Sequence, residues 1–196
     1  MSEKYRFDTM SLHSGHVPDK ETGSRAVPIY QTTSYVFKDT DEAAALYNME
    51  VGGHLYTRIS NPTIATLEQR LASLDGGVSC IACSSGMAAM HLVVSAICSS
   101  GDHIVASNKM YGANINLLQH TMTRFGIKTD FVNPNDLEEI EKSIKPNTKL
   151  VFGEVIGNPG LDVMNVPEVA KICKKKNVPL AIDATFNTPY LSLIHI

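Results

Sequence analysis

A short polar segment separates two apolar runs between residues 81 and 90, which read IACSSGMAAM. Ser84, Ser85 and Gly86 stand directly before a helical pattern that begins at Met87. A serine in this place caps a helix, because its hydroxyl accepts a hydrogen bond from a first-turn amide that has no acceptor within the helix. Accessible amides at the positive end of a helix dipole also bind phosphate. The segment therefore predicts a helix cap, an anion site, or both.

Three further polar or aromatic residues follow predicted strands: Tyr111, Asn158 and Asp183. Ligands of open α/β sheets bind beyond the carboxyl ends of the strands, so one site can hold all three side chains. A phosphate cradle, an aromatic ring, an amide and a carboxylate together match the groups that pyridoxal 5'-phosphate (PLP) requires. Each residue also has an ordinary structural explanation, since Tyr111 can pack, Asn158 can form a turn and Asp183 can cap the next turn.

Alternating apolar and amphipathic segments predict the fold that positions these residues. Continuous apolar strands separated by amphipathic helices are typical of an α/β fold with a mostly parallel sheet and helices on both faces. The expected strands are residues 78–83, 103–107, 128–132, 149–155 and 178–183. The expected helices run from the cap Asn61 to Gly76, from Met87 to near Gly101, over 112–126, from Pro134 through Ile144, and over 166–176.

Residues 1–60 show little periodicity and are interrupted by glycine and proline, which predicts an extended N-terminal arm. The next domain, residues 61–190, contains the predicted sheet. The sequence has neither of the glycine-rich fingerprints of dinucleotide-binding folds and P-loop NTPases. A non-enzymatic α/β module that binds another anion in the phosphate cradle therefore remains an alternative to a PLP enzyme.

Composition excludes several other classes of function. The net charge is −3, and no basic face with interleaved aromatic residues indicates nucleic-acid binding. No membrane span or signal peptide is predicted, so we expect a cytoplasmic protein without a membrane partner. No metal site is expected, because Cys80 and Cys83 form a C-x-x-C without a second pair or a nearby histidine. Both are expected to be buried, reduced thiols.

Five motifs occur in order: YTRISNPT, SSGMAAM, YGAN, GEVIGNPGLDV and IDATFNTPY. Together they resemble the Cys/Met-metabolism family of fold-type I PLP enzymes, and the resemblance covers residues 7–190. It implies PLP as the cofactor and residues 61–190 as the PLP-binding domain. It also implies a homo-oligomer, a dimer of dimers, in which the arm completes the site of a neighbouring subunit.

The resemblance gives each candidate residue a role. Ser85, Gly86 and Met87 would bind the cofactor phosphate, the latter two through backbone amides. Tyr111 would stack on the cofactor ring and assist proton transfer, as the candidate catalytic residue. The other expected cofactor contacts are Tyr56 and Arg58 to the phosphate of the neighbouring subunit, Asn158 to the phenolic oxygen, Asp183 to the pyridinium nitrogen, and Thr185 beside it.

The version IGNPG at residues 156–160 is similar to the O-acetylhomoserine sulfhydrylase branch of the family. This branch implies γ-replacement: O-acetyl-L-homoserine loses acetate from Cγ and takes up sulfide or a thiol, which gives homocysteine or methionine. A cystathionine γ-synthase or a methionine γ-lyase of the same family is the alternative.

The family pattern places two further functional residues beyond this chain. These are the lysine that carries the cofactor and the arginine that binds the substrate carboxylate. We therefore expect the chain to be about half of a family member, an N-terminal part that is inactive by itself. Its last residues, LSLIHI, equal the translation of a transposase adaptor used in sequencing libraries, so residues 191–196 are expected to be a non-native tail.

Overall fold

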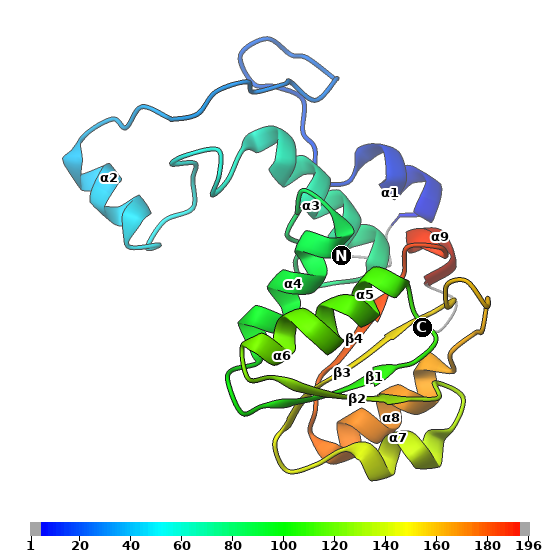
Figure 1. Ribbon diagram of the computed structural model, residues 1–196. Helices are drawn as coiled ribbons and strands as arrows, with labels where there is room; N and C mark the ends of the chain where they lie inside the picture. The colour runs from blue at the N-terminus through cyan, green and yellow to red at the C-terminus, as the bar shows by residue number, and fades with distance from the viewer. Residues whose placement is uncertain (1–4, 193–196) are drawn as a thin grey trace. The chain divides into compact units, whose positions relative to one another are not determined.

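The computed structural model describes residues 5–192, and the chain divides into two compact units between Ala82 and Cys83. Figure 1 traces the helices and strands of both units. The sequence places the end of the arm at residue 60, whereas this division assigns the helix that follows the arm to the first unit. The two units are described in turn.

Within residues 5–82, the first unit contains three helices, and its buried core is small. They are α1 (Phe7–His13), α2 (Thr40–Tyr47) and α3 (Pro62–Asp75). Helices α1 and α3 contact each other, and Arg70 of α3 donates a hydrogen bond from Nε to the Ser14 carbonyl at 2.9 Å. No residue of α1 or α2 is buried. The sequence analysis predicts an extended arm over residues 1–60 and did not predict α1 and α2, which lie within it.

The predicted caps of α3 are confirmed. Asn61 accepts a hydrogen bond from the Thr63 amide, Pro62 occupies the first turn, and Gly76 ends the helix in the left-handed conformation. The cap also holds the arm, because Asn61 Nδ2 donates to the Tyr30 carbonyl at 2.8 Å. One asparagine side chain thus fixes both the start of a helix and the path of the arm.

The strand predicted over residues 78–83 is wrong. The segment forms no regular structure and does not pair with any strand within residues 5–192, and the side chains of Val78 and Ile81 are exposed. An apolar run becomes a strand only where a neighbouring strand accepts its backbone hydrogen bonds. Cys83 is exposed and Cys80 only half-buried, so the expected burial of these thiols is also wrong, although none of the four cysteines forms a disulfide within residues 5–192.

The second unit is a four-stranded parallel sheet with helices on both faces, as the sequence predicts (Figure 1). The strand order is β2-β1-β3-β4. The strands are β1 (His103–Ser107), β2 (Lys128–Val132), β3 (Thr148–Glu154) and β4 (Leu180–Asp183). The helices are α4 (Gly86–Ile97), α5 (Gly112–Asn116), η2 (Leu117–Thr121), α6 (Met122–Arg124), α7 (Leu137–Ser143), α8 (Val166–Lys176) and α9 (Thr188–Ser192).

These boundaries confirm the strands predicted after residue 100 and the helices of the sheet domain to within a few residues. The helix expected over 112–126 is one helical segment in which η2 is π-helical. Helix α7 starts after its cap Asp136 rather than at Pro134. Residues 191 and 192 end α9, whereas the rest of the predicted non-native tail, 193–196, lies outside the described residues.

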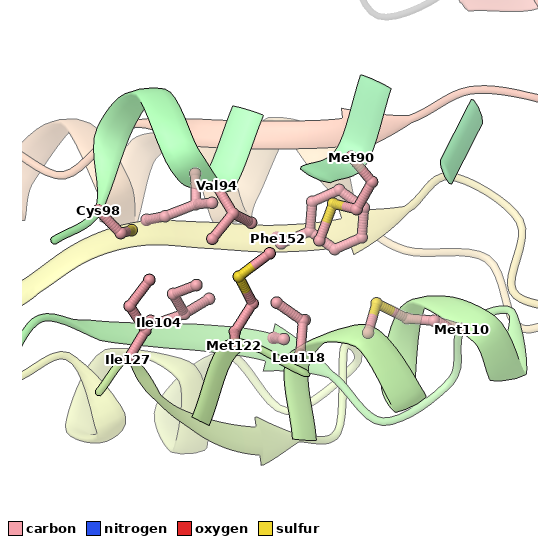
Figure 2. Close-up of a cluster of buried hydrophobic side chains, with 11 residues drawn as sticks. Met90, Val94, Cys98, Ile104, Met110, Leu118, Met122, Ile127 and Phe152 are labelled. Carbon is pink, nitrogen blue, oxygen red and sulfur yellow. The ribbon is translucent and has the colours of Figure 1, made fainter. Parts of the chain in front are cut away.

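Alternating side chains of the strands divide the interior into two cores. Ile104 and Phe152 belong to the cluster that α4 covers, whereas Val105 and Val151 belong to the cluster under α7 and α8. This alternation follows from the two-residue period of a strand. Figure 2 shows the first cluster, with Met90, Val94, Cys98, Ile104, Met110, Leu118, Met122, Ile127 and Phe152 labelled.

We expect Met90→Ala to lower the free energy of unfolding by about 2–5 kcal/mol, because Met90 is 5% exposed within the first cluster. Leu92→Ala is the matched control on the same helix, since Leu92 is 47% exposed. Urea unfolding measures both changes. Equal effects of the two substitutions would contradict the placement of α4 against the sheet.

Candidate active site

Several predicted site residues meet at the carboxyl ends of the parallel strands. Glu154 ends β3 and is paired in register with Asp183, the last residue of β4. Helix α4 runs against the strands, because in Figure 2 its residue Met90 lies by Phe152 near the end of β3, and Cys98 lies by Ile104 at the start of β1. The N-terminus of α4 therefore points to the same edge of the sheet.

The N-terminus of α4 has the capped and accessible geometry that the sequence predicts. Ser85 Oγ accepts a hydrogen bond from the Ala88 amide at 3.1 Å, so the cap is confirmed. Ser85 and Gly86 are exposed, and a Cβ atom added at Gly86 would meet nothing within 4 Å. The amides of Gly86 and Met87 have no acceptor within the helix. This end of α4 can therefore receive an anion as well as being capped.

Tyr111 is held through its backbone by a buried carboxylate. Its amide donates a hydrogen bond to Glu154 Oε1 at 2.8 Å, and its side chain is 49% exposed. Asn114 Nδ2 donates to the same oxygen at 3.2 Å, and the Asn158 backbone amide lowers the pKa of Glu154. Burial raises the pKa of Glu154, and the nearby Asp183 carboxylate adds to this effect while the donors oppose it.

Asn158 lies in a tight loop after β3. The Gly157 amide donates to the Asp162 carbonyl at 2.8 Å, which closes the loop. Gly157 is buried, and a Cβ atom there would come within 2.3 Å of the Lys109 carbonyl oxygen. Only glycine permits this approach of two backbones. The loop that carries Asn158 is thus packed directly against the segment that leads to Tyr111.

Asp183 uses one oxygen for a local turn. Its Oδ1 accepts hydrogen bonds from the amide of Thr185 at 2.9 Å and from the Thr185 hydroxyl. The ordinary interpretation of Asp183 as a turn cap is therefore confirmed. Within the described residues, Asp183 Oδ2 makes no hydrogen bond, so this oxygen can still face a ligand.

Tyr56 and Arg58 belong to the first unit. The guanidinium carbon of Arg58 lies 5.6 Å from the centre of the Tyr56 ring, and both side chains are exposed. Tyr56 also pairs with Ser34 in an isolated antiparallel bridge. These two residues contact each other and form an exposed cation–π pair on the arm.

The residues of the second unit fit PLP. Free amides at the start of α4 suit its phosphate, the exposed ring of Tyr111 suits stacking, and the unpaired oxygen of Asp183 suits a pyridinium nitrogen. Among the described residues, no three His, Cys, Asp or Glu side chains are grouped so that they could hold a metal ion. None of the helices within residues 5–192 has the length and apolar character needed to cross a bilayer.

Sequence reasoning missed Glu154 and Asn187. Glu154 could have been found, because it is the one charged residue in the otherwise apolar segment LVFGEV at residues 150–155. Asn187 follows β4, is 3% exposed, and neither polar atom of its side-chain amide has a hydrogen-bond partner. An asparagine next to a turn is ordinary in sequence, so nothing in the pattern marks it as buried.

His103 forms a second polar cluster at the opposite, amino end of the sheet. The ring is buried, with Nδ1 at 2.8 Å from Thr148 Oγ1 and Nε2 at 3.2 Å from Asp130 Oδ2. Burial lowers the pKa of His103, the Lys145 ammonium adds to this effect, and Asp130 opposes it. This cluster lies at the opposite end of the sheet from the site residues of the second unit, and we expect it to affect stability.

The stability of the fold should therefore depend on the protonation of His103. Because its pKa is lower in the folded state than the ordinary 6.5, the unfolded state binds the proton more readily. The contribution is complete above about pH 6.5 and is lost as the pH falls through the lowered value. We expect urea unfolding of the wild type to lose more stability between pH 7.5 and 5 than His103→Gln does. Parallel pH profiles of the two proteins would contradict this expectation.

A parallel sheet with free amides, an aromatic ring and a carboxylate at its carboxyl edge is the arrangement expected of an α/β domain for a phosphorylated ligand. The model of the family described as Cys/Met metabolism PLP-dependent enzyme matches residues 8–193. The chain belongs to this family.

Individual relatives agree with this assignment. The chain is 46% identical over 191 residues to an O-acetyl-L-homoserine sulfhydrylase from Leptospira meyeri, covering 97% of this chain and 43% of the relative. It is 37% identical to an L-methionine gamma-lyase from Treponema denticola, covering 96% of this chain and 47% of the relative. The chain thus spans less than half the length of these proteins.

A solved structure from Campylobacter jejuni, assigned as an O-acetylhomoserine (thiol)-lyase, superposes with a TM-score of 0.93 at 38% identity. The match covers 97% of this chain and 47% of that chain. That structure contains a pyridoxyl-lysine phosphate. The fold and the cofactor class predicted from the sequence are therefore confirmed.

Proposed function

We propose that the full-length protein containing this chain is a PLP-dependent transferase that makes homocysteine. In the proposed reaction the Cγ–O bond of O-acetyl-L-homoserine breaks, a C–S bond to sulfide forms, and acetate leaves. The observation that carries the proposal is the carboxyl edge of the sheet, where Glu154 joins the Tyr111 and Asn158 segments beside Asp183. The 46% identity to a sulfhydrylase supports the choice of substrate.

Each site residue has a proposed task in this reaction. The amides of Gly86 and Met87, with the Ser85 cap, bind the phosphate group. Asn158 orients the ring through its phenolic oxygen. When bound, PLP withdraws electrons from the substrate α-carbon, so that the α and β protons become acidic enough to move.

Asp183 and Tyr111 act on the ring and the protons. Asp183 holds the proton on the pyridine nitrogen through its unpaired oxygen, while Thr185 fixes the other oxygen. Tyr111 covers one face of the ring and assists proton transfer. The lysine that moves the protons and the arginine that binds the substrate carboxylate are expected in the part of the relatives that this chain does not span.

The arm and the sheet domain have separate proposed tasks. Residues 61–190 bind PLP, whereas residues 1–60 reach a neighbouring subunit, to whose phosphate Tyr56 and Arg58 contribute. A homo-oligomer, at least a dimer, is therefore part of the proposal. We place the enzyme in the cytoplasm, because within residues 5–192 none of the four cysteines forms a disulfide, as is typical of a reducing compartment.

Parallel assays of the full-length protein test the proposed substrates. We expect turnover of O-acetylhomoserine with sulfide to exceed turnover of O-succinylhomoserine with cysteine. Methionine is the third substrate, because a relative at 37% identity is named a methionine gamma-lyase. Preferred release of methanethiol from methionine would show that the protein is a lyase and not the proposed transferase. Activity only with the succinyl substrate would indicate a cystathionine γ-synthase.

A non-enzymatic binding module is the alternative from another class. Titration of the full-length protein with PLP, followed by borohydride reduction and mass measurement, separates the two. We expect a visible absorption band and a covalent pyridoxyl adduct after reduction. Absence of both would favour the binding module.

A further inference from the structure

Within residues 5–192, Glu154 is the only buried Asp or Glu, and it is 6% exposed. Both of its hydrogen bonds come from the segment that holds Tyr111: the Tyr111 amide donates at 2.8 Å, and the Asn114 side chain, in the helix that follows, donates at 3.2 Å. The loop that holds Asn158 begins directly after Glu154 at the end of β3. A buried carboxylate is costly unless donors compensate for its lost hydration. We therefore expect a buried carboxylate at this place to have a role in the site.

The two segments that Glu154 joins come from different parts of the chain. One follows β1 and the other follows β3, and their backbones meet where Gly157 lies against the Lys109 carbonyl. That contact prevents the segments from moving closer together, because even one added carbon atom would overlap with the carbonyl oxygen. The hydrogen bonds to Glu154 prevent them from moving apart. Together these contacts fix the separation of the two segments in both directions.

We propose that Glu154 is a positioning residue that holds the Tyr111 ring and the Asn158 side chain at a fixed separation, so that both meet one cofactor ring. The expected effect of Glu154 on catalysis rests on the proposed function, whereas its effect on the position of the two segments does not. Removing the carboxylate leaves amides without an acceptor and frees both segments. Glu154 itself touches neither the substrate nor the reacting atoms in this proposal.

Amide hydrogen exchange of the full-length protein without added PLP tests the structural part. In Glu154→Ala we expect exchange to be about tenfold or more faster in residues 108–116 and 156–163, and unchanged in β1 and β3. Glu154→Gln, which keeps an acceptor oxygen, should exchange more slowly in these segments than Glu154→Ala. Glu139→Ala is the matched control, because exposed Glu139 accepts one backbone hydrogen bond, from Asn133 at 2.9 Å.

The pattern of exchange decides between positioning and general stability. The proposal would be overturned if exchange were faster over the whole sheet, or if it were no faster in the two segments than in the wild type. If Glu154→Ala does not fold, Glu154→Asp replaces it, because that variant keeps the charge but withdraws the oxygens by one methylene group. Glu154→Asp should then show the same localised increase, and exchange equal to the wild type would overturn the proposal.

A double-mutant cycle tests the catalytic consequence. We expect Glu154→Ala to lower kcat by about 10²-fold with little change in KM, and to lower it by less than about fivefold in a Tyr111→Ala background. Glu154→Gln should recover at least about a tenth of the wild-type kcat. Equal losses in both backgrounds would show that Glu154 does not act through Tyr111. An inactive wild type would refute the proposed function, while the exchange result would still decide the role of Glu154.

Discussion

Asp183→Asn in the full-length protein should lower kcat about 10³-fold. A carboxylate about 4 Å from a pyridinium nitrogen contributes about 4 kcal/mol at an effective dielectric constant near 20, and each 1.36 kcal/mol is a factor of ten in rate. Asparagine keeps an oxygen that can accept the hydrogen bonds from Thr185, so the turn is preserved while the charge is lost. Steady-state kinetics with O-acetylhomoserine and sulfide measures the loss.

Thr185→Val is the control for the turn, because it removes the hydroxyl donor and leaves the carboxylate in place. We expect this variant to retain at least about a tenth of the wild-type kcat, since it loses one hydrogen bond only. If Asp183→Asn were as active as Thr185→Val, Asp183 would be a turn residue without a part in the reaction.

Arg58→Ala should weaken the binding of PLP by about 10- to 100-fold, the range expected when one charge-assisted hydrogen bond to a phosphate is lost. The guanidinium is exposed and supported by the Tyr56 ring, so its removal leaves the core of the unit intact. Equilibrium dialysis against PLP measures the affinity. Arg25→Ala, another exposed arginine of the arm, is the control and should bind PLP as the wild type does.

Mixed oligomers show whose site Arg58 serves. If it serves the partner, a dimer of one Arg58→Ala and one Asp183→Asn subunit contains one intact site and one site with both substitutions. At a PLP concentration that fills the wild-type site but not the Arg58→Ala site, random mixing of the two variants should then recover about a quarter of the wild-type activity. Mixtures that stay inactive would place Arg58 in the site of its own subunit or outside any site.

Local sequence rules predict most of the second unit, because the residues that favour each helix or strand are also those that pack into the core. Ile104 and Val105 are buried on opposite faces, so β1 is a continuous apolar run that a parallel sheet explains and a one-sided sheet does not. Asn177 ends α8 in the left-handed conformation, which asparagine adopts more readily than most residues after the last turn of a helix. Propensity, capping and burial agree at these positions.

The errors occur where long-range contacts decide the outcome. Residues 78–83 have the composition of a strand, but pairing depends on a neighbour that composition does not specify. The link from Glu154 to Tyr111 spans 43 residues, and a single sequence contains no information on which amide a carboxylate will meet. The site residues were found through motifs, whereas the residue that connects them required the fold.

The strand order β2-β1-β3-β4 has a consequence for folding during synthesis. The ribosome releases β1 and β2 first, then β3, which adds beside β1, and finally β4, which adds beside β3. Each new strand therefore joins a free edge, and no pair that has already formed must reopen to admit a later strand. A nascent chain can assemble this sheet stepwise as it emerges, but at every stage it presents an unpaired edge on which a chaperone or another nascent chain can act.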